Sequence, residues 1–387
     1  MQHPFDIPQI KKRQRKSMLF KATSLVMVAL SLLFVSIFLL SIASKGYSAF
    51  TQSYIQVSVD FTKVQSNPRA AIERNYRRLI SNTWIRNLPK LLDANPKLTE
   101  QKQLLWVLAS SEADQYIKGN INKLKSKQKT LIDGLKTERK IKRSFNTILF
   151  THGDSRMPEN SGFLSAIKGT IMTIVITMLV GFPIGVMSAI YLQEFAKDNR
   201  IRHFIEININ NLAAVPSILF GLLGLAIFIN FLGMPRASAL VGGLTLGIMI
   251  LPIIIVTTQS ALRSVPPSIR QAGFAMGLTR WQVVRHFVLP LAMPGILTGS
   301  IISLAQAIGE TAPLLLLGMI TFMPDAPTFV TDATTVMSAQ IYTWSSMPQN
   351  GYIERTSAAI LILLSVMVTL NLLAITLRSR YKNRFSL

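Results

Sequence analysis

Apolar residues gather in six long stretches that are almost free of charge, at 22–43, 169–193, 207–232, 239–262, 291–318 and 357–377. As a helix, the first stretch would be about 33 Å long at 1.5 Å per residue, enough to cross the ~30 Å hydrocarbon core of a bilayer. A signal peptide is the alternative for this stretch, but no convincing small-residue cleavage site follows it. The pattern therefore predicts an all-α, polytopic membrane protein with six transmembrane helices.

A polar insertion at 44–161 separates the first stretch from the second. Asn95 and Pro96 have the residue types of an N-cap and a first helical residue, and Gly119 is a plausible helix terminator. Beyond it, four apolar residues share one helical stripe among many lysines: Ile121, Leu124, Leu131 and Leu135. We expect the insertion to be a largely helical domain. Its basic surface is either a solvated face over a small core or a vestibule that concentrates an anion or docks an acidic partner.

Basic residues flank the apolar stretches on one side of the predicted membrane. They gather at 11–21, at 197–202, at 263–285 and at 378–384, whereas acids outnumber bases at 319–356. By the positive-inside rule, both termini are expected in the cytoplasm of a bacterial cell and the insertion is expected outside its inner membrane. The predicted division is a cytoplasmic N-terminus (1–21), a first transmembrane helix (22–43), the extracytoplasmic insertion (44–161), a five-helix core (162–379) with a cytoplasmic loop at 263–290, and a cytoplasmic tail (380–387).

The composition of the chain argues against several classes of function. The net charge of +23 would also suit a nucleic-acid-binding protein, but the flanking basic residues account for much of it, so we expect membrane lipid and no nucleic acid as a partner. The chain has no cysteine, no clustered histidines and no paired carboxylates in the apolar stretches. We therefore expect no metal site and no catalytic residues. It also lacks the Gly-x-x-x-x-Gly-Lys-Ser/Thr motif, so any ATP must be bound by another chain.

The loop at 263–290, which we call the elbow, has the local signals of two short helices. Pro266 and Pro267 can open the first helix, and Gly277 can end it in a left-handed conformation. Thr279 and Gln282 can form a capping box for the second helix. We expect Trp281, Val284 and Val288 to share one face, with Arg280 and Arg285 elsewhere. Such an elbow could dock on a soluble partner and transmit its movement, or it could lie on anionic lipid.

The elbow resembles the cytoplasmic coupling signature of ABC-importer permeases. That signature has Glu-Ala-Ala, three residues, Gly, nine residues, Ile, one residue and Leu-Pro; here the places hold Gln271-Ala272-Gly273, Gly277, Phe287 and Leu289-Pro290. The spacing is intact, but Gln271, Gly273 and Phe287 depart from the signature. The resemblance implies that the elbow couples the chain to an ATPase through Gln271, Ala272, Gly273, Gly277, Arg280, Trp281, Leu289 and Pro290.

Three further motifs narrow the family. Gly309-Glu310-Thr311-Ala312-Pro313-Leu314, Ala214-Val215-Pro216-Ser217 and Glu354-Arg355-Thr356-Ser357-Ala358-Ala359 resemble the A-type permeases of high-affinity phosphate (Pst) ABC importers. The resemblance covers the last ~225 residues and leaves the insertion outside. It implies half of a translocation pathway for inorganic phosphate, with four kinds of partner: a second permease subunit, two copies of an ATPase subunit that bind ATP–Mg, an extracytoplasmic phosphate-binding protein, and phosphate itself. No cofactor is expected on this chain.

Glu310 is the formal charge that falls within the predicted spans, and such an acid normally faces a bundle interior or a water-filled cavity. Pro313 has no amide for the carbonyl of Gly309, so we expect an opened turn here. At the place of Gln306 the resemblance would put an Arg; without it, the cation that neutralises phosphate is expected on the partner permease. The predicted substrate pathway is Glu310, Gln306, Thr311, Pro313 and Thr173.

Alternatives remain at these positions. Glu310 could instead hold two helices or subunits together, and Thr173 lies on a threonine face with Thr170 and Thr177 that helix packing also explains. For the whole chain, the alternatives are a permease for another oxyanion, such as sulfate or molybdate, and a stand-alone channel or secondary transporter.

Overall fold

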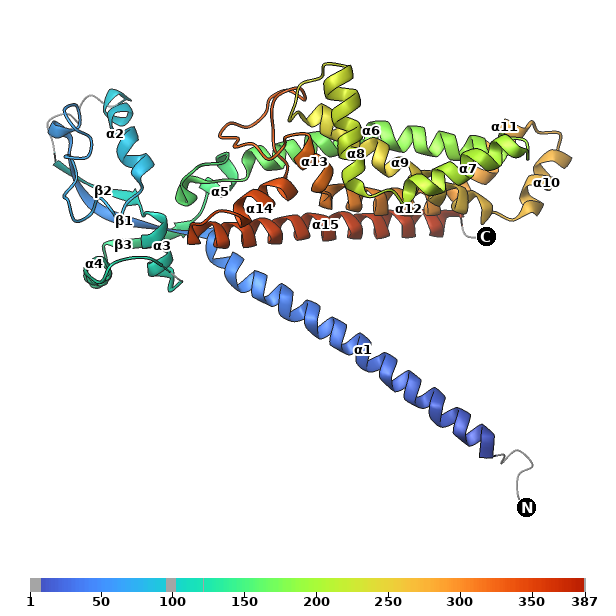
Figure 1. Cartoon of the computed structure of the whole chain (residues 1–387), viewed down its shortest axis with the longest axis horizontal. Coiled ribbons are helices and arrows are strands. Elements are labelled where there is room, and N and C mark those ends of the chain that lie inside the picture. The colour runs from blue at the N-terminus through green and yellow to red at the C-terminus, as the bar shows by residue number, and fades with distance from the viewer. Residues whose placement is uncertain (1–7, 95–101, 121, 386–387) are drawn as a thin grey trace.

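The structure is a computed structural model that describes residues 8–94, 102–120 and 122–385. The molecule is elongated, with the insertion at one end and the elbow at the other (Figure 1). Both ends of the chain lie toward the end that carries the elbow. The insertion and the elbow are therefore separated by the length of the helical core. The predicted N-cap at Asn95 lies outside the described residues.

Within the described residues, five helices are long and apolar enough to cross a membrane, or six if a bent pair counts as one span. The five are α1 (Pro8–Tyr47), α6 (Leu164–Ile190) with a π-helical end at Tyr191–Phe195, α9 (Ala239–Arg263), α11 (Arg280–Val283) running through a π-helical turn into α12 (Leu289–Gly309), and α15 (Asn350–Phe385).

Two of the six predicted spans are not straight helices. The stretch at 207–232 forms α7 (Arg200–Ala213) and α8 (Ser217–Gly224), which continues as a π-helix over Leu225–Phe231; the two arms are bent by 102°. The bend falls at Pro216, which cannot supply a helical amide. The stretch at 291–318 stops being helical at Gly309, and a short helix, α13 (Ala312–Leu316), follows the break.

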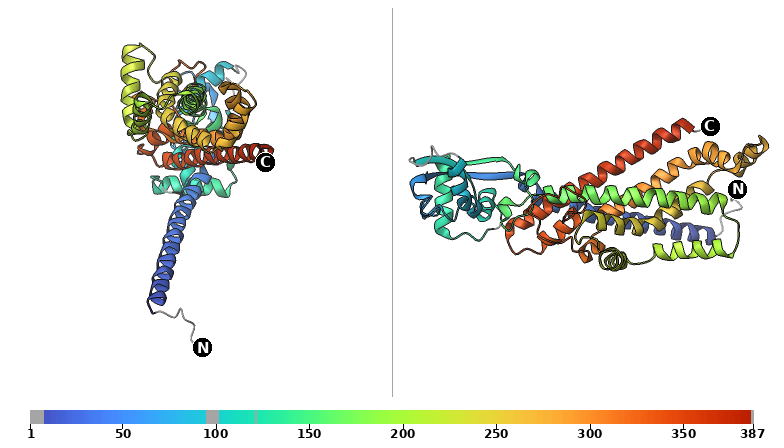
Figure 2. Two further views of the ribbon diagram at one scale, coloured as in Figure 1. Left: turned by 90° about the vertical axis from the view of Figure 1, so that its right-hand side faces the viewer. Right: turned by 90° about the horizontal axis from the view of Figure 1, so that it is seen from above.

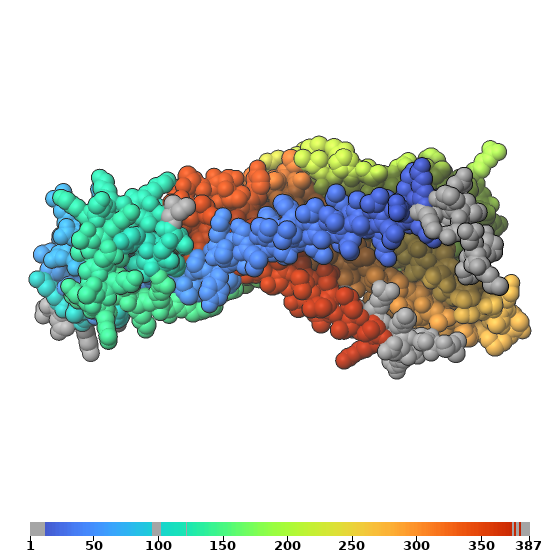
Figure 3. Space-filling model, turned by 90° about the horizontal axis from the view of Figure 1, so that it is seen from below, coloured from blue at the N-terminus to red at the C-terminus, as the bar shows by residue number. Residues whose placement is uncertain are grey.

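Helix α9 is the centre of the core. Buried residues make up 67% of its most apolar stretch, against 6% for α1. Gly181 and Gly185 on α6 allow this close packing, because a Cβ on Gly185 would lie 2.7 Å from Ile254 of α9. By contrast, α1 leaves the core and is exposed along most of its length (Figure 3), apart from its C-terminal end, where Gly46 packs on α15. The C-terminal half of α15 diverges from the other helices (Figure 2). These two helices present apolar surface that the chain itself does not cover.

The insertion is a mixed domain, so the expectation of a largely helical one is wrong. Its sheet has the antiparallel order β2-β1-β3, with β1 (Thr51–Asp60), β2 (Lys102–Leu108) and β3 (Ile141–Phe145). Ile55, Val57 and Val59 alternate along β1 and enter the core. The accompanying helices are α2 (Asn82–Ala94), α3 (Ser111–Lys118), α4 (Ser126–Thr137) and α5 (Ile148–Thr151).

The predicted helix end at Gly119 is confirmed, since this residue closes α3 with φ +81°. The predicted apolar stripe is only partly right. Leu135 is buried on α4, but Leu124 precedes that helix and Ile121 lies outside the described residues.

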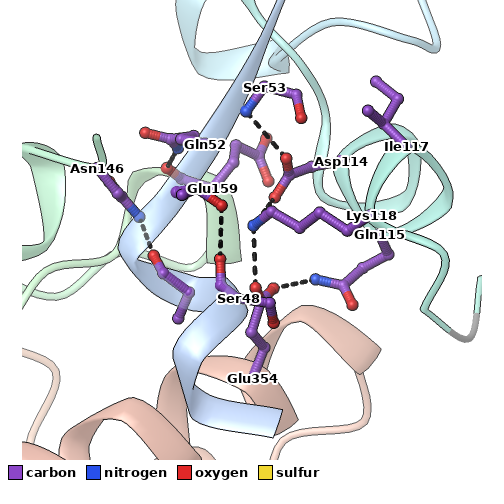
Figure 4. Close-up of polar contacts among 12 residues, drawn as sticks. Ser48, Gln52, Ser53, Asp114, Gln115, Ile117, Lys118, Asn146, Glu159 and Glu354 are labelled. Carbon is purple, nitrogen blue, oxygen red and sulfur yellow. Dashed lines mark hydrogen bonds and ion pairs between the residues drawn. The ribbon is translucent and has the colours of Figure 1, made fainter. Parts of the chain in front are cut away.

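A buried polar cluster joins the insertion to the start of α15 (Figure 4). Lys118 Nζ lies 2.6 Å from Asp114 and 2.9 Å from Glu354, and Gln115 donates a hydrogen bond to the same Glu354 carboxylate. Asp114 also accepts the Ser53 amide at 2.9 Å. Burial raises the pKa of Asp114, although Lys118 opposes the rise. We call this cluster the junction.

Two neighbours of Glu354 complete the junction. Arg355 is buried and donates to the carbonyl of Ser161. A side chain at Gly351 would collide with Ser111, the first residue of α3. The sequence motif at 354–359 therefore begins where the insertion meets the last helix.

Candidate functional site

The elbow has the predicted two-helix shape. Helix α10 (Pro267–Ala275) follows Pro266 and begins at Pro267, and Gly277 has φ +76° after its end. Thr279 and Gln282 form the expected capping box at the start of α11, with the Thr279 amide 2.8 Å from Gln282 Oε1. These caps turn the chain sharply between two helices at one end of the molecule (Figure 1).

Gly273 sets how closely the two elbow helices approach. It is buried, and a Cβ at this position would lie 2.8 Å from Val283 Cγ2 on α11. This departure from the signature has a steric cause, because the side chain of Val283 occupies the space that an alanine methyl group would need.

The end of α6 holds the elbow in place. Arg270 on α10 donates to both carboxylate oxygens of Glu194, at 2.7 and 3.2 Å, and to the carbonyls of Leu262 and Val265 at the end of α9. Glu194 is almost fully buried. A bidentate Arg–carboxylate pair fixes orientation as well as distance. Movement of α10 is therefore coupled to α6 and α9.

An aromatic contact adds a second link between the same elements. The ring of Phe195, next to Glu194, lies 6.4 Å from Trp281, and the guanidinium of Arg280 lies 6.0 Å from the Phe195 ring centroid. Such contacts stabilise by about 0.5–1.5 kcal/mol each. The end of α6 thus contacts both helices of the elbow.

Several predicted coupling residues face outward. Gln271, Ala272 and Arg280 are exposed, and Trp281 is 54% exposed. The expectation that Trp281 shares a face with Val284 and Val288 is wrong, since both valines are buried. Leu289 and Pro290 are half-buried at the start of α12, within a helix that runs on from α11. The exposed set is the surface that a soluble partner could reach.

The predicted opening at Glu310 is confirmed. Helix α12 ends at Gly309, and Glu310 has extended backbone with φ −69° and ψ 132°. Its carbonyl accepts a hydrogen bond from the Ser338 hydroxyl at 2.9 Å. The Glu310 side chain is half-buried, and no residue of the described ranges donates to its carboxylate or pairs with it. The Glu310 carboxylate can therefore interact with a group outside the described residues of this chain.

The short helices that follow the two breaks, α8 and α13, pack against each other. Gly221 of α8 packs so closely on α13 that a Cβ would lie 2.6 Å from Pro313 Cα. The motifs that contain Pro216 and Glu310 are thus adjacent half-helices, beside one another in the middle of the molecule (Figure 1). Interrupted helices of this kind form binding sites in transporters because their unpaired backbone groups can face a solute.

The remaining pathway residues divide into two groups. Gln306 is exposed and Thr311 is half-buried, beside Glu310. Thr173 on α6 is only 1% exposed and packs against α9. Thr177, one turn further along α6, donates to the Gly243 carbonyl of α9 at 3.1 Å. Thr173 therefore does not line an open surface, and its assignment to the substrate pathway is corrected to helix packing.

Comparison with known proteins identifies the family. The family of binding-protein-dependent transport system inner membrane components matches residues 181–386, which include both helix breaks and the elbow. This chain belongs to that family. A domain of unknown function, DUF3333, matches residues 8–76 and 68–126, which cover α1 and part of the insertion.

Characterised relatives carry related names. The phosphate transport system permease protein PstA 1 of Mycobacterium tuberculosis is 32% identical over 224 residues, 57% of this chain and 73% of the relative. PstA 2 of Mycobacterium bovis is 35% identical over 211 residues, 54% of this chain and 69% of the relative. Among solved structures, a chain of the inward-facing MetNI methionine ABC transporter is 18% identical with a TM-score of 0.45, covering 56% of this chain and 96% of that one.

Membership of this family establishes the general function of the chain. It is the multi-pass inner-membrane component of a binding-protein-dependent ABC transporter, and it is not an enzyme. Such a component works with an ATPase and with a substrate-binding protein. The exposed face of the elbow is the part of the core that suits contact with an ATPase.

Proposed function

We propose that this chain is the permease subunit that forms half of the translocation pathway of an ATP-driven importer of inorganic phosphate. The observation that carries the proposal is the pair of helix breaks at Glu310 and Pro216: the helices that follow them, α13 and α8, pack against each other at Pro313 and Gly221. Both breaks lie in motifs of phosphate-type permeases, and several relatives are named phosphate permeases. The exposed apolar surfaces of α1 and α15 support a second, related permease subunit as the other half.

The proposed cycle needs partners on both sides of the membrane. Two ATPase subunits bind ATP–Mg and dock on the exposed face of the elbow, and a phosphate-binding protein delivers phosphate from outside. ATP-driven movement of α10 passes through Arg270 and Glu194 to α6 and α9, which alternates access between the two permeases. The purified chain alone should hydrolyse no ATP, and hydrolysis by an uncontaminated preparation would contradict this division of labour.

Glu310 has two roles open to it in this pathway. A free carboxylate repels hydrogen phosphate, but it can pair with a cation of the partner permease or accept a hydrogen bond from a phosphate proton. Both roles need the charge, because charge-assisted hydrogen bonds are roughly twice as strong as neutral ones.

The test is Glu310→Gln, which keeps the shape and removes the charge. We expect phosphate uptake to fall about tenfold or more with near-normal assembly. Uptake of radiolabelled phosphate is measured in cells that lack other phosphate importers, with complex abundance checked in the same membranes. Glu138→Gln, a change at an exposed ion pair of the insertion, is the control. Normal uptake rules out the pathway role, and loss of assembly together with uptake indicates a structural one.

We further propose that both termini and the elbow are cytoplasmic and that the insertion is outside. The basic flanks support this orientation, as does the placement of the insertion opposite the elbow (Figure 1). Because the chain has no cysteine, single-cysteine variants report cleanly. An impermeant thiol reagent added to intact cells should label Lys127→Cys and not Arg285→Cys; the reverse pattern would invert the topology.

A further inference from the structure

A basic hollow of about 390 Å³ lies where the insertion faces the segment that leads into α6. Four cationic side chains line it: Arg77, Arg78, Lys123 and Lys125. They come from the segment before α2 and from the segment that leads into α4. Neutral donors share the wall, namely Asn82, Ser110, Ser111, Gln128 and Gln349, and apolar atoms of Leu124, Met157 and Pro158 complete it.

The four cations have no acidic partner in the part of the chain that the structure describes. No carboxylate lies within ion-pair distance of any of them, whereas Lys118, Lys63 and Lys140 elsewhere in the insertion each contact one at 2.6 to 3.1 Å. Like charges that converge on one hollow repel each other, and an anion bound between them relieves that repulsion.

The two carboxylates in the wall are already used within the protein. Glu112 accepts the backbone N–H of Lys123 at 2.5 Å, which fixes the segment that carries two of the cations. Glu159 is buried and accepts hydrogen bonds from Ser81 and from the Ser111 amide. Four cations against two engaged carboxylates leave the hollow with an excess of positive charge.

Local hydrogen bonds also orient the donors. Arg77 donates through Nε to the Ile72 carbonyl at 2.8 Å, which leaves its terminal nitrogens for another acceptor. Gln128 accepts the Lys125 amide with its oxygen at 3.0 Å, so its NH₂ group remains a donor. Guanidinium and amide N–H groups around one hollow are the donor set that recognises phosphate oxygens.

We propose that this hollow is a binding site for a phosphate-class oxyanion on the insertion. The proposal goes beyond the proposed import of phosphate and does not rest on it, since the site lies apart from Glu310 and can be tested by binding alone. The volume exceeds that of a bare tetrahedral anion and falls in the usual range for small-ligand sites. The shared chemistry is therefore the phosphoryl group, free or esterified.

The experiment uses the full-length chain in lipid nanodiscs. Binding of inorganic phosphate, glycerol 3-phosphate and sulfate is measured by calorimetry at constant ionic strength. The variants are Arg77→Gln with Arg78→Gln, and Lys123→Gln with Lys125→Gln. The matched control is Lys127→Gln with Lys136→Gln, two exposed lysines of α4 outside the hollow. Melting temperatures verify that each variant is folded.

We expect each hollow variant to bind phosphate or the phosphomonoester about tenfold more weakly, or worse, and the control to stay within about twofold of the parent chain. Tighter binding of inorganic phosphate identifies the free ion as the ligand, and tighter binding of glycerol 3-phosphate identifies an ester. Because the hollow variants leave Glu310 unchanged, the binding that they remove is assigned to the hollow and not to the core. Binding of neither phosphate compound, or binding that survives both variants, overturns the proposal.

Discussion

The guanidinium of Arg270 meets four acceptors, two of them on an element that is remote in the sequence. Two are the oxygens of Glu194 and two are carbonyls at the end of α9. Glu194 and Arg270 are separated by 76 residues. Each was visible as an ionisable residue at the edge of a predicted span, but no local signal showed that they would pair. The contact between the elbow and the core therefore could not be predicted from the sequence.

Removing this cation should weaken the elbow. Arg270→Ala leaves a nearly buried carboxylate without a partner, which costs roughly 3–5 kcal/mol for buried pairs. We expect a lower melting temperature in detergent and loss of ATP-driven uptake. Arg285→Ala, which removes an exposed cation of the same region, is the control. A melting temperature that does not change would show that the pair contributes nothing to holding the elbow.

Glu159 offers a test through pH. Burial raises its pKa above the ordinary value of 4.5, against hydrogen bonds from Ser81 and Ser111 that lower it. The folded chain then holds this proton more tightly than the unfolded chain, so the contribution to stability is greatest at low pH and is lost as pH rises through the folded pKa. Glu159→Gln should flatten the dependence of melting temperature on pH above about 4.5, the ordinary pKa of the group. Parallel curves for the variant and the parent chain would contradict this sign.

At the scale of elements, the elbow was predictable because its signals are local. Pro266, Gly277 and the Thr279–Gln282 capping box each act within a few residues, and each is found as expected. The sheet of the insertion was missed although Ile55, Val57 and Val59 alternate along β1. Its strand partners, β2 and β3, are distant in the sequence, so no local signal shows which segments pair with β1.

The bend between α7 and α8 was missed for a different reason. The stretch at 207–232 carries no charged residue, and composition alone cannot distinguish a straight span from a bent pair. Pro216 was the available signal, since it lacks the amide that a continuous helix needs. At Glu310 the same argument from Pro313 gave the correct result.

Gly273 makes the packing of the elbow testable. Gly273→Ala places a methyl group 2.8 Å from Val283, and overpacking of this kind costs roughly 1–3 kcal/mol. We expect reduced ATP-driven uptake and a lower melting temperature. The second change Val283→Ala should restore much of the uptake by making room. If the double variant is no better than Gly273→Ala alone, contact with Val283 is not the reason for the glycine.

At the scale of the molecule, the junction attaches the insertion to the helical core. Lys118 lies between Asp114 and Glu354 (Figure 4), and its side chain is only 4% exposed. Replacing it with an apolar residue of similar length leaves two carboxylates close together in a buried place, where like charges repel and remain desolvated.

Lys118→Met should therefore loosen the insertion from α15. We expect the melting temperature to drop, with a loss of roughly 3–5 kcal/mol, and limited proteolysis to cut the insertion faster. Lys136→Met, an exposed lysine on α4, is the matched control and should change neither. Unaltered proteolysis of Lys118→Met would mean that the surrounding apolar packing alone fixes the domain.

The two sides of the junction are synthesised at different times. Lys118 and its partner Glu354 are 236 residues apart, so the first has been made long before the second exists. At about 5–20 residues per second, that interval lasts roughly 12–47 s. During that interval Lys118 can pair with Asp114 but not with Glu354, which is still to be synthesised. The contact between Lys118 and Glu354 can form only after the start of α15 has been synthesised. The junction is therefore completed late in the biogenesis of the protein.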